Sequence, residues 1–189
     1  MRMISYLGIF SFSVLNLAIV TTHATEVTCE RPSALAEFSG SWSRGTRRSY
    51  EEASPGAGFS FAFNGRYGVG TVYVYDLGKK DWVEGVGDLR LADQMDEARA
   101  GIRELERRGN FRNLVFDPQM KVIFSCQHFL YVRVSGNLDG VAVNSAILIG
   151  VRNSKIVKFR LTLRDVIASQ LDGELASLVD AVFTADPLR

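Results

Sequence analysis

The last predicted strand of this chain carries basic side chains at alternate positions. These residues are Lys158, Arg160 and Arg164, and they alternate with Val157, Phe159, Leu161 and Leu163. Because successive side chains of a strand point to opposite faces of a sheet, the basic and apolar residues are predicted to lie on opposite faces. Guanidinium groups offer paired donors to carboxylates and phosphates, so the basic face is a candidate binding surface for an acidic ligand or partner.

A second strand is predicted to extend this candidate surface. One long strand is expected from Lys121 to Ser135, and Tyr131 and Arg133 would share one of its faces. We therefore expect a set of binding residues drawn from both strands: Tyr131, Arg133, Lys158, Arg160 and Arg164. The alternative is a solvated strand face whose charges discourage pairing with other chains.

His128 is the only histidine outside the first 24 residues, and the alternation places it on the apolar side of the same long strand. It could serve as a general base together with a carboxylate from another strand, which would make the protein a hydrolase. The alternative is a core histidine that is hydrogen-bonded to a backbone carbonyl. The sequence contains neither Gly-x-Ser-x-Gly nor His-Glu-x-x-His, and a single imidazole excludes a zinc site with two histidines. We predict no metal and no cofactor.

Residues 1–24 have the features of a cleaved signal peptide. Arg2 precedes an uncharged apolar run from Ile4 to Val20, and Thr22 and Ala24 are small residues at the positions that a signal peptidase recognises. The alternative is an uncleaved anchor, but several serines interrupt a run that is short for a membrane span. We expect a protein exported to the periplasm of a Gram-negative bacterium or to the medium, with no stable membrane insertion after cleavage.

Both cysteines, Cys29 and Cys126, lie beyond the expected cleavage site. A pair of cysteines in an exported chain normally forms a disulfide, because the compartment is oxidising. We predict the pair Cys29–Cys126, which would attach the N-terminal segment to the core. The alternative of a reactive or metal-bound thiol lacks a C-x-x-C spacing to support it.

The charge balance excludes strong attraction to nucleic acids. The chain has 22 Lys and Arg against 21 Asp and Glu. Arg2 is the only charged residue within residues 1–24, apart from a neutral histidine, so the mature chain would be formally neutral. A dedicated nucleic-acid binder normally carries a basic excess. We therefore expect a protein partner or a small anionic ligand, with the oligomeric state undetermined.

The remaining patterns predict the elements that position these residues. Residues 25–58 are expected to be irregular, and residues 59–189 to form a single domain. A hairpin is predicted over 59–77, where Phe59, Phe61 and Phe63 alternate with smaller residues. Asp88 is expected to cap an amphipathic helix that ends near Arg108, and a second amphipathic helix covers about 171–183. Four strands are predicted between the helices, over 111–117, 121–135, 141–151 and 155–164.

This order, β-β-α-β-β-β-β-α, predicts an α+β domain with a mostly antiparallel sheet covered by two helices. It resembles the PsbP-like (Mog/PsbP) fold. The strings Pro55-Gly56-Ala57-Gly58-Phe59-Ser60 and Thr71-Val72-Tyr73-Val74-Tyr75-Asp76 also resemble uncharacterised exported bacterial proteins. Neither resemblance includes a catalytic motif. We therefore expect a non-enzymatic binding domain, with the hydrolase based on His128 as the alternative.

Overall fold

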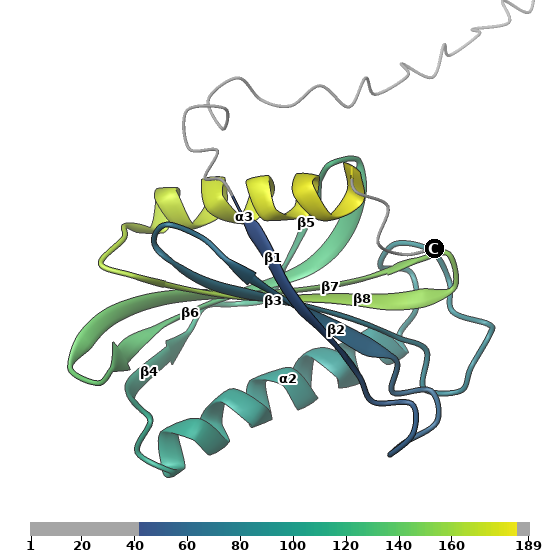
Figure 1. The fold of residues 1–189 in the computed structure, drawn as a ribbon, viewed down its shortest axis with the longest axis horizontal. Coiled ribbons are helices and arrows are strands. Elements are labelled where there is room, and N and C mark those ends of the chain that lie inside the picture. The colour runs from purple at the N-terminus through teal and green to yellow at the C-terminus, as the bar shows by residue number, and fades with distance from the viewer. Residues whose placement is uncertain (1–41, 185–189) are drawn as a thin grey trace, which may run out of the picture.

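The computed structural model describes residues 42–184, which form one antiparallel sheet and two helices (Figure 1). The eight strands are β1 (Ser43–Ser49), β2 (Phe59–Asn64), β3 (Gly68–Tyr75), β4 (Phe111–Phe116), β5 (Met120–Phe124), β6 (Gln127–Leu138), β7 (Val141–Arg152) and β8 (Lys155–Arg164). The helices are α2 (Arg90–Arg107) and α3 (Ala168–Thr184). This arrangement confirms the predicted fold class.

The strands follow the spatial order β1-β2-β3-β8-β7-β6-β4, and β5 pairs with β6 beside β4. Every pair is antiparallel, and the central strands β6, β7 and β8 are joined by tight turns. The first hairpin, β2–β3, attaches to β8 along its full length. The strands predicted to carry the candidate binding residues therefore lie at the centre of the sheet.

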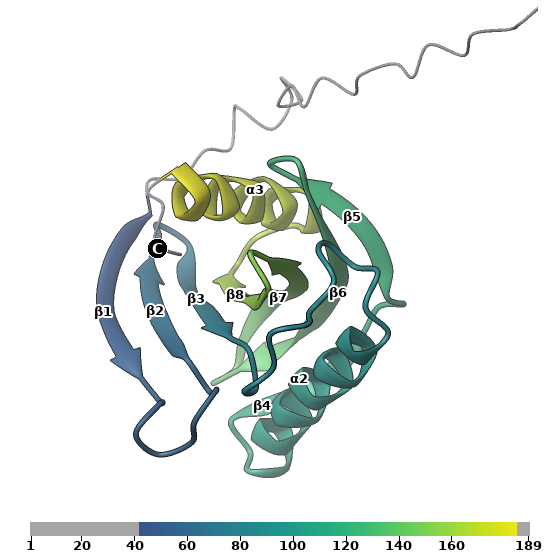
Figure 2. The ribbon, with the colours of Figure 1, turned by 90° about the vertical axis from the view of Figure 1, so that its right-hand side faces the viewer.

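The two helices lie on opposite faces of the sheet (Figure 2). The sheet curves around α3, and Leu171, Leu175 and Leu178 of that helix pack against Phe159 and Leu161 of β8. On the other face, α2 uses its buried side chains Leu91, Met95 and Ile102 to cover residues of β6, β7 and β8. The strand interiors are apolar on both faces because both faces are covered.

The segment expected to be irregular contains a strand. β1 pairs with β2, and its seven residues, Ser-Arg-Gly-Thr-Arg-Arg-Ser, are all exposed. A sequence of this composition has no apolar alternation, so periodicity could not reveal it. This segment is a strand because its backbone pairs with β2 at the edge of the sheet.

The long strand predicted over 121–135 is wrong, because the chain reverses within it. Ser125 and Cys126 both have positive φ, +47° and +63°, and they form the two-residue turn of a hairpin between β5 and β6. Two successive positive φ values characterise the tight turns that fit the twist of a hairpin. Neither residue is a glycine, so the sequence carried no turn signal. After the reversal, Val122 and Phe124 pack on the α3 face, whereas Leu130 lies on the α2 face.

The predicted signal peptide and Cys29 lie outside the described residues. Neither α2 nor α3, the two helices of residues 42–184, is both long enough and apolar enough to cross a bilayer.

Candidate functional site

A groove lies between α2 and the centre of the sheet, and β3, β8 and β7 form its floor. Registers across these strands place Tyr73 opposite Lys158, and Thr71 opposite Arg160. On the other side of β8, Ile147 lies opposite Arg160. The strand alternation therefore directs Lys158 and Arg160 to the α2 face, while Val157, Phe159 and Leu161 enter the α3 core as predicted.

Two adjoining cavities make up this groove. The first, about 220 Å³, lies under α2 between Glu97, Ile102 and the two cations. The second, about 240 Å³, continues toward β4 and shares Tyr73 and Arg160 with the first. Its other lining residues are Val69, Thr71, Phe111, Leu138 and Thr162. A ligand that spans both cavities would meet positive charge under α2, and hydroxyl and apolar groups beyond it.

Lys158 and Arg160 are half-buried cations, and neither makes an ion pair with a carboxylate of residues 42–184. The Nζ atom of Lys158 lies 4.8 Å from the ring centroid of Tyr73 and 5.3 Å from that of Tyr75. Burial lowers the pKa of Lys158, and the nearby Arg160 lowers it further, against the opposing effect of Glu97. Burial also lowers the pKa of Arg160. The lining of the groove therefore combines two cations with one carboxylate, that of Glu97, and carries a net positive charge.

Glu97 of α2 accepts a hydrogen bond from Gln94 of its own helix, and Gln94 is in turn bonded to the sheet. The hydroxyl of Tyr75 donates to Gln94 over 3.0 Å, and the amide nitrogen of Gln94 donates to Glu97 over 3.3 Å. Burial raises the pKa of Tyr75, and the negative charge of Glu97 raises it further. Glu97 thus limits the positive potential of the groove without pairing directly with Lys158. Residue spacing alone did not predict Tyr73 or Glu97 at this site, because their proximity to the cations depends on how α2 docks on the sheet.

Arg133 and Tyr131 do not belong to this groove, which corrects the prediction that they share a face with Lys158 and Arg160. The hydroxyl of Tyr131 donates to Asp172 of α3 over 2.6 Å, and Arg133 both donates to that hydroxyl over 3.0 Å and pairs with Asp172. Burial raises the pKa of Tyr131, as does its bond to Asp172. These two residues attach α3 to the opposite face of the sheet.

Arg164 and His128 also lie outside the groove. Arg164 is exposed at the end of β8, and neither cavity includes it. His128, expected on the apolar side, is exposed beside the β5–β6 turn, where it pairs with Ile123 and its Cβ approaches Gly85. The tight turn moved His128 to a hairpin end, which explains its exposure. Cys126 is exposed in the same turn, while Cys29 lies outside the described residues.

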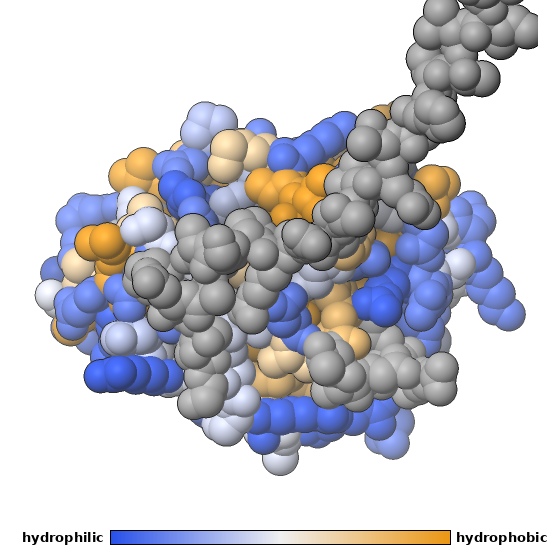
Figure 3. Space-filling model, turned by 90° about the horizontal axis from the view of Figure 1, so that it is seen from above, coloured by the Kyte–Doolittle hydropathy of each residue, from blue (hydrophilic) through white to orange (hydrophobic). Residues whose placement is uncertain are grey.

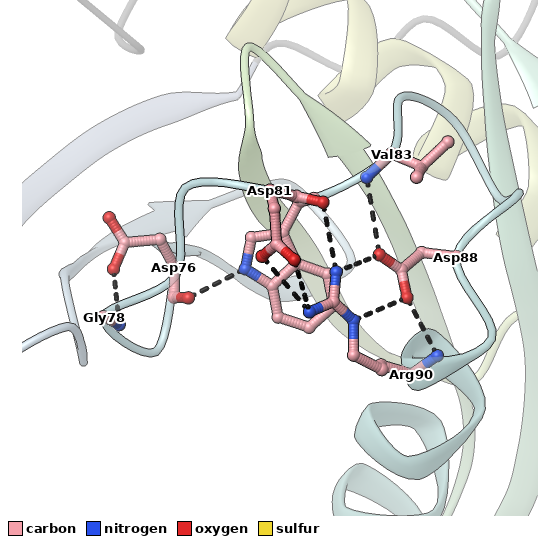
Figure 4. Close-up of polar contacts among 7 residues, drawn as sticks. Asp76, Gly78, Asp81, Val83, Asp88 and Arg90 are labelled. Carbon is pink, nitrogen blue, oxygen red and sulfur yellow. Dashed lines mark hydrogen bonds and ion pairs between the residues drawn. The ribbon is translucent and has the colours of Figure 1, made fainter.

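A second polar cluster holds the loop that leads into α2 (Figure 4). Arg90 donates to Asp88 over 2.6 and 2.8 Å, and its guanidinium lies 4.3 Å from the ring centroid of Trp82. The backbone nitrogen of Arg90, the first residue of α2, donates to Asp88 as well. The N-cap position is Leu89, so Asp88 lies one residue before the capping position that the sequence predicted for it. Arg90 also pairs with Asp81 over 3.2 Å. The hydrogen bonds from Arg90 hold the pKa of Asp88 well below its usual range.

These contacts indicate a structural cluster, because its charges compensate one another. Trp82 is buried, and its indole nitrogen donates to the carbonyl of Asp76 over 2.8 Å. Trp82 therefore belongs to the hydrophobic core, and the acidic residues of this loop stabilise the loop that leads into α2. Among residues 42–184, no group of three His, Cys, Asp or Glu side chains is placed to hold a metal ion.

Two of the solved structures that align with this chain have low sequence identity to it. The solution structure of cyanobacterial PsbP (CyanoP) from Synechocystis sp. PCC 6803 aligns with a TM-score of 0.41 and 14% identity, covering 76% of this chain and 90% of that one. CyanoP represents the family that the order of elements resembles. A Pseudomonas aeruginosa protein of unknown function, suggested to be a regulator, aligns with a TM-score of 0.37 and 11% identity over 78% of this chain and 83% of its own. Neither similarity bears on what this chain binds.

No family model matches the chain, and no curated protein matches its sequence.

Proposed function

We propose that this protein is an exported, non-enzymatic binding domain that holds a small anionic ligand in the groove between α2 and the sheet. The observation that carries the proposal is the pair of half-buried cations, Lys158 and Arg160, on the floor of that groove, whose charge Glu97 offsets only in part. A half-buried charge without a directly paired counter-ion is costly, and an anionic ligand would offset that cost. Carboxylates and phosphates fit the donors that the two side chains offer.

The shape of the groove supports a ligand with one charged end. Beyond Arg160, the second cavity presents the hydroxyls of Thr71 and Thr162 beside the apolar side chains of Val69 and Phe111. A carboxylate or phosphate group at Lys158 and Arg160 would therefore extend an apolar or hydroxylated remainder toward β4. The lining supports a binding role, because its cations and hydroxyls are hydrogen-bond donors for an anion. No contact of His128 favours the alternative hydrolase.

The ligand can be sought by native mass spectrometry of the mature protein purified from its own cell envelope. An additional mass that is released on denaturation would identify the ligand directly. A bare protein would then be titrated by calorimetry with succinate, inorganic phosphate and a medium-chain fatty acid as probes. A protein that binds none of these anions, and carries no ligand from the cell, would contradict the proposal.

Arg160→Gln tests the groove, and Arg164→Gln on the same strand is the matched control. We expect Arg160→Gln to weaken anion binding by about tenfold to a hundredfold, because a hydrogen bond to a charged group contributes roughly 1.5–3 kcal/mol. Arg164 lies outside both cavities, so Arg164→Gln should leave the affinity unchanged. Equal losses in the two variants would show that only the overall charge matters.

Export and the disulfide belong to the same proposal. Signal-peptide cleavage after Ala24 would release a chain that begins at Thr25, and a Cys29–Cys126 bond would attach its start to the β5–β6 turn. N-terminal sequencing of the protein from fractionated cells tests the cleavage site. A chain that retains Met1 and sediments with membranes would contradict cleavage.

A further inference from the structure

The edge strand β1 offers a second binding surface, independent of the groove. β1 pairs with β2 on one side, and on its other side no strand of residues 42–184 is present. All seven residues of β1 are exposed. The unpaired N–H and C=O groups of such an edge can form a ladder with a further strand.

Three arginines lie on this edge, and aromatic rings hold each of them in place. The guanidinium carbon of Arg44 lies 3.8 Å from the ring centroid of Phe61, that of Arg47 lies 4.3 Å from Phe59, and that of Arg48 lies 5.2 Å from Tyr50. None of the three pairs with a carboxylate of the described residues. A guanidinium that stacks on a ring keeps its in-plane N–H donors available for an anion.

The register places these charges on both faces of the sheet edge. Arg47 lies opposite Phe61, whose side chain enters the α3 core, whereas Arg48 lies opposite Ser60 on the other face. Hydrophilic residues also form much of the rim of the face seen from above α3 (Figure 3). An anionic surface that approached from one side would reach Arg47 but not Arg48. A strand with acidic residues on both of its faces would reach both, through direct cross-strand pairs.

The charges also disfavour a second copy of this chain as the added strand. Pairing β1 with another β1 would bring three arginines from each copy together along one edge with no acidic residue between them, which is unfavourable. The opposite edge of the sheet is no better, because β4 and β5 carry Arg112 and Lys121 and no acidic residue. Because no strand of residues 42–184 covers this edge of β1, and because arginines stacked on aromatic rings lie along it, we propose that β1 is the docking strand for an acidic, extended segment of another protein.

A fluorescent peptide built from Thr-Glu-Glu-Thr repeats tests this proposal, because the repeat places glutamates on both faces of a strand. Fluorescence anisotropy at low ionic strength should show binding to the mature protein. Hydrogen exchange should show new protection of β1 amides in the complex. The double variant R47E/R48E should bind about tenfold more weakly, since two cross-strand ion pairs become repulsive. The matched variant R112E, on the opposite sheet edge, should bind as the native protein does.

Two further arms separate strand addition from general attraction between charges. A peptide of the same sequence with N-methyl groups on alternate backbone amides cannot form the ladder, so it should lose binding. Equal binding of the methylated peptide, or tighter binding of vesicles rich in phosphatidylglycerol, would overturn strand addition in favour of an anionic surface. If R47E/R48E retains its circular dichroism spectrum, it should accept a peptide of Thr-Lys-Lys-Thr repeats. If the folded R47E/R48E variant did not bind the lysine peptide, the proposal would also be overturned.

Discussion

Lys158 is the residue whose chemistry most directly connects stability with binding. Its pKa lies below the ordinary 10.5 because burial disfavours the charged form. The unfolded chain therefore binds its proton more tightly than the folded chain does. By linkage, the free energy of unfolding rises with pH between the folded-state pKa and 10.5, and the charged side chain opposes folding at neutral pH.

We expect Lys158→Met to stabilise the protein and to weaken anion binding. The melting temperature at pH 7 should rise by about 1–3 °C, because 1 kcal/mol corresponds to roughly 2–4 °C in a chain of this size. The difference from the native protein should shrink above the folded-state pKa of Lys158. Differential scanning calorimetry across neutral and alkaline pH measures this effect. A variant that melts at a lower temperature while retaining affinity would show that Lys158 acts only through packing on Tyr73 and Tyr75.

The charged form of Asp88 stabilises the folded protein, whereas the charged form of Lys158 opposes folding. Its pKa is depressed by the hydrogen bonds from Arg90, so its contribution to stability is present above the unfolded-state pKa of about 4. That contribution is lost as the pH falls through the folded-state pKa. Asp88→Asn should therefore lower the melting temperature at pH 7, and the difference from the native protein should diminish below about pH 4. A constant difference over this range would indicate that the variant loses packing rather than charge.

The two helices contribute differently to the molecule. α2 closes the groove over Lys158 and Arg160, whereas α3 is attached to the other face by the bonds of Arg133 and Tyr131 to Asp172. Both partners of the Arg133–Asp172 pair are about one-third exposed, so solvent weakens their attraction. The pair therefore positions α3 more than it stabilises the fold.

Arg133→Met separates this structural role from the binding role expected from sequence. We expect the free energy of unfolding to fall by about 1 kcal/mol, after allowance for solvent screening. Anion affinity should stay unchanged, because Arg133 lies on the face opposite the groove. Urea denaturation and calorimetric titration of the same preparation measure the two quantities. A loss of anion affinity without a loss of stability would show that Arg133 contributes to binding after all.

For the molecule as a whole, the N-terminal segment is the largest feature that remains a prediction. A Cys29–Cys126 bond would close a loop of about one hundred residues, for which the chain-entropy model gives stabilisation of about 4–5 kcal/mol. Mass spectrometry without reductant should find the mature chain lighter by the mass of two hydrogens. Rapid alkylation of both thiols in the native, unreduced protein would contradict the bond. Cys126 lies in an exposed turn, where a partner can reach it.

Local sequence patterns were sufficient for much of the fold. The alternation of Val157, Lys158, Phe159 and Arg160 predicted which side chains leave the core, and the structure places them accordingly. The amphipathic spacing of Leu91, Met95 and Ile102 similarly predicted α2. These features depend on the geometry of a strand or a helix within a few residues, so the sequence carries them directly.

The site itself required the tertiary structure. The sequence determined that Arg133 and Arg160 each lie on one face of a strand, but not that these faces are opposite. That outcome depends on the registers between β6, β7 and β8, which align Arg133 with Ala146 and Leu161 rather than with Ile147 and Arg160. Register and helix docking arise from contacts between residues far apart in the chain, where a shift of one residue moves every side chain to the other face. Only these long-range contacts bring Tyr73 and Glu97 to the cations and form the groove.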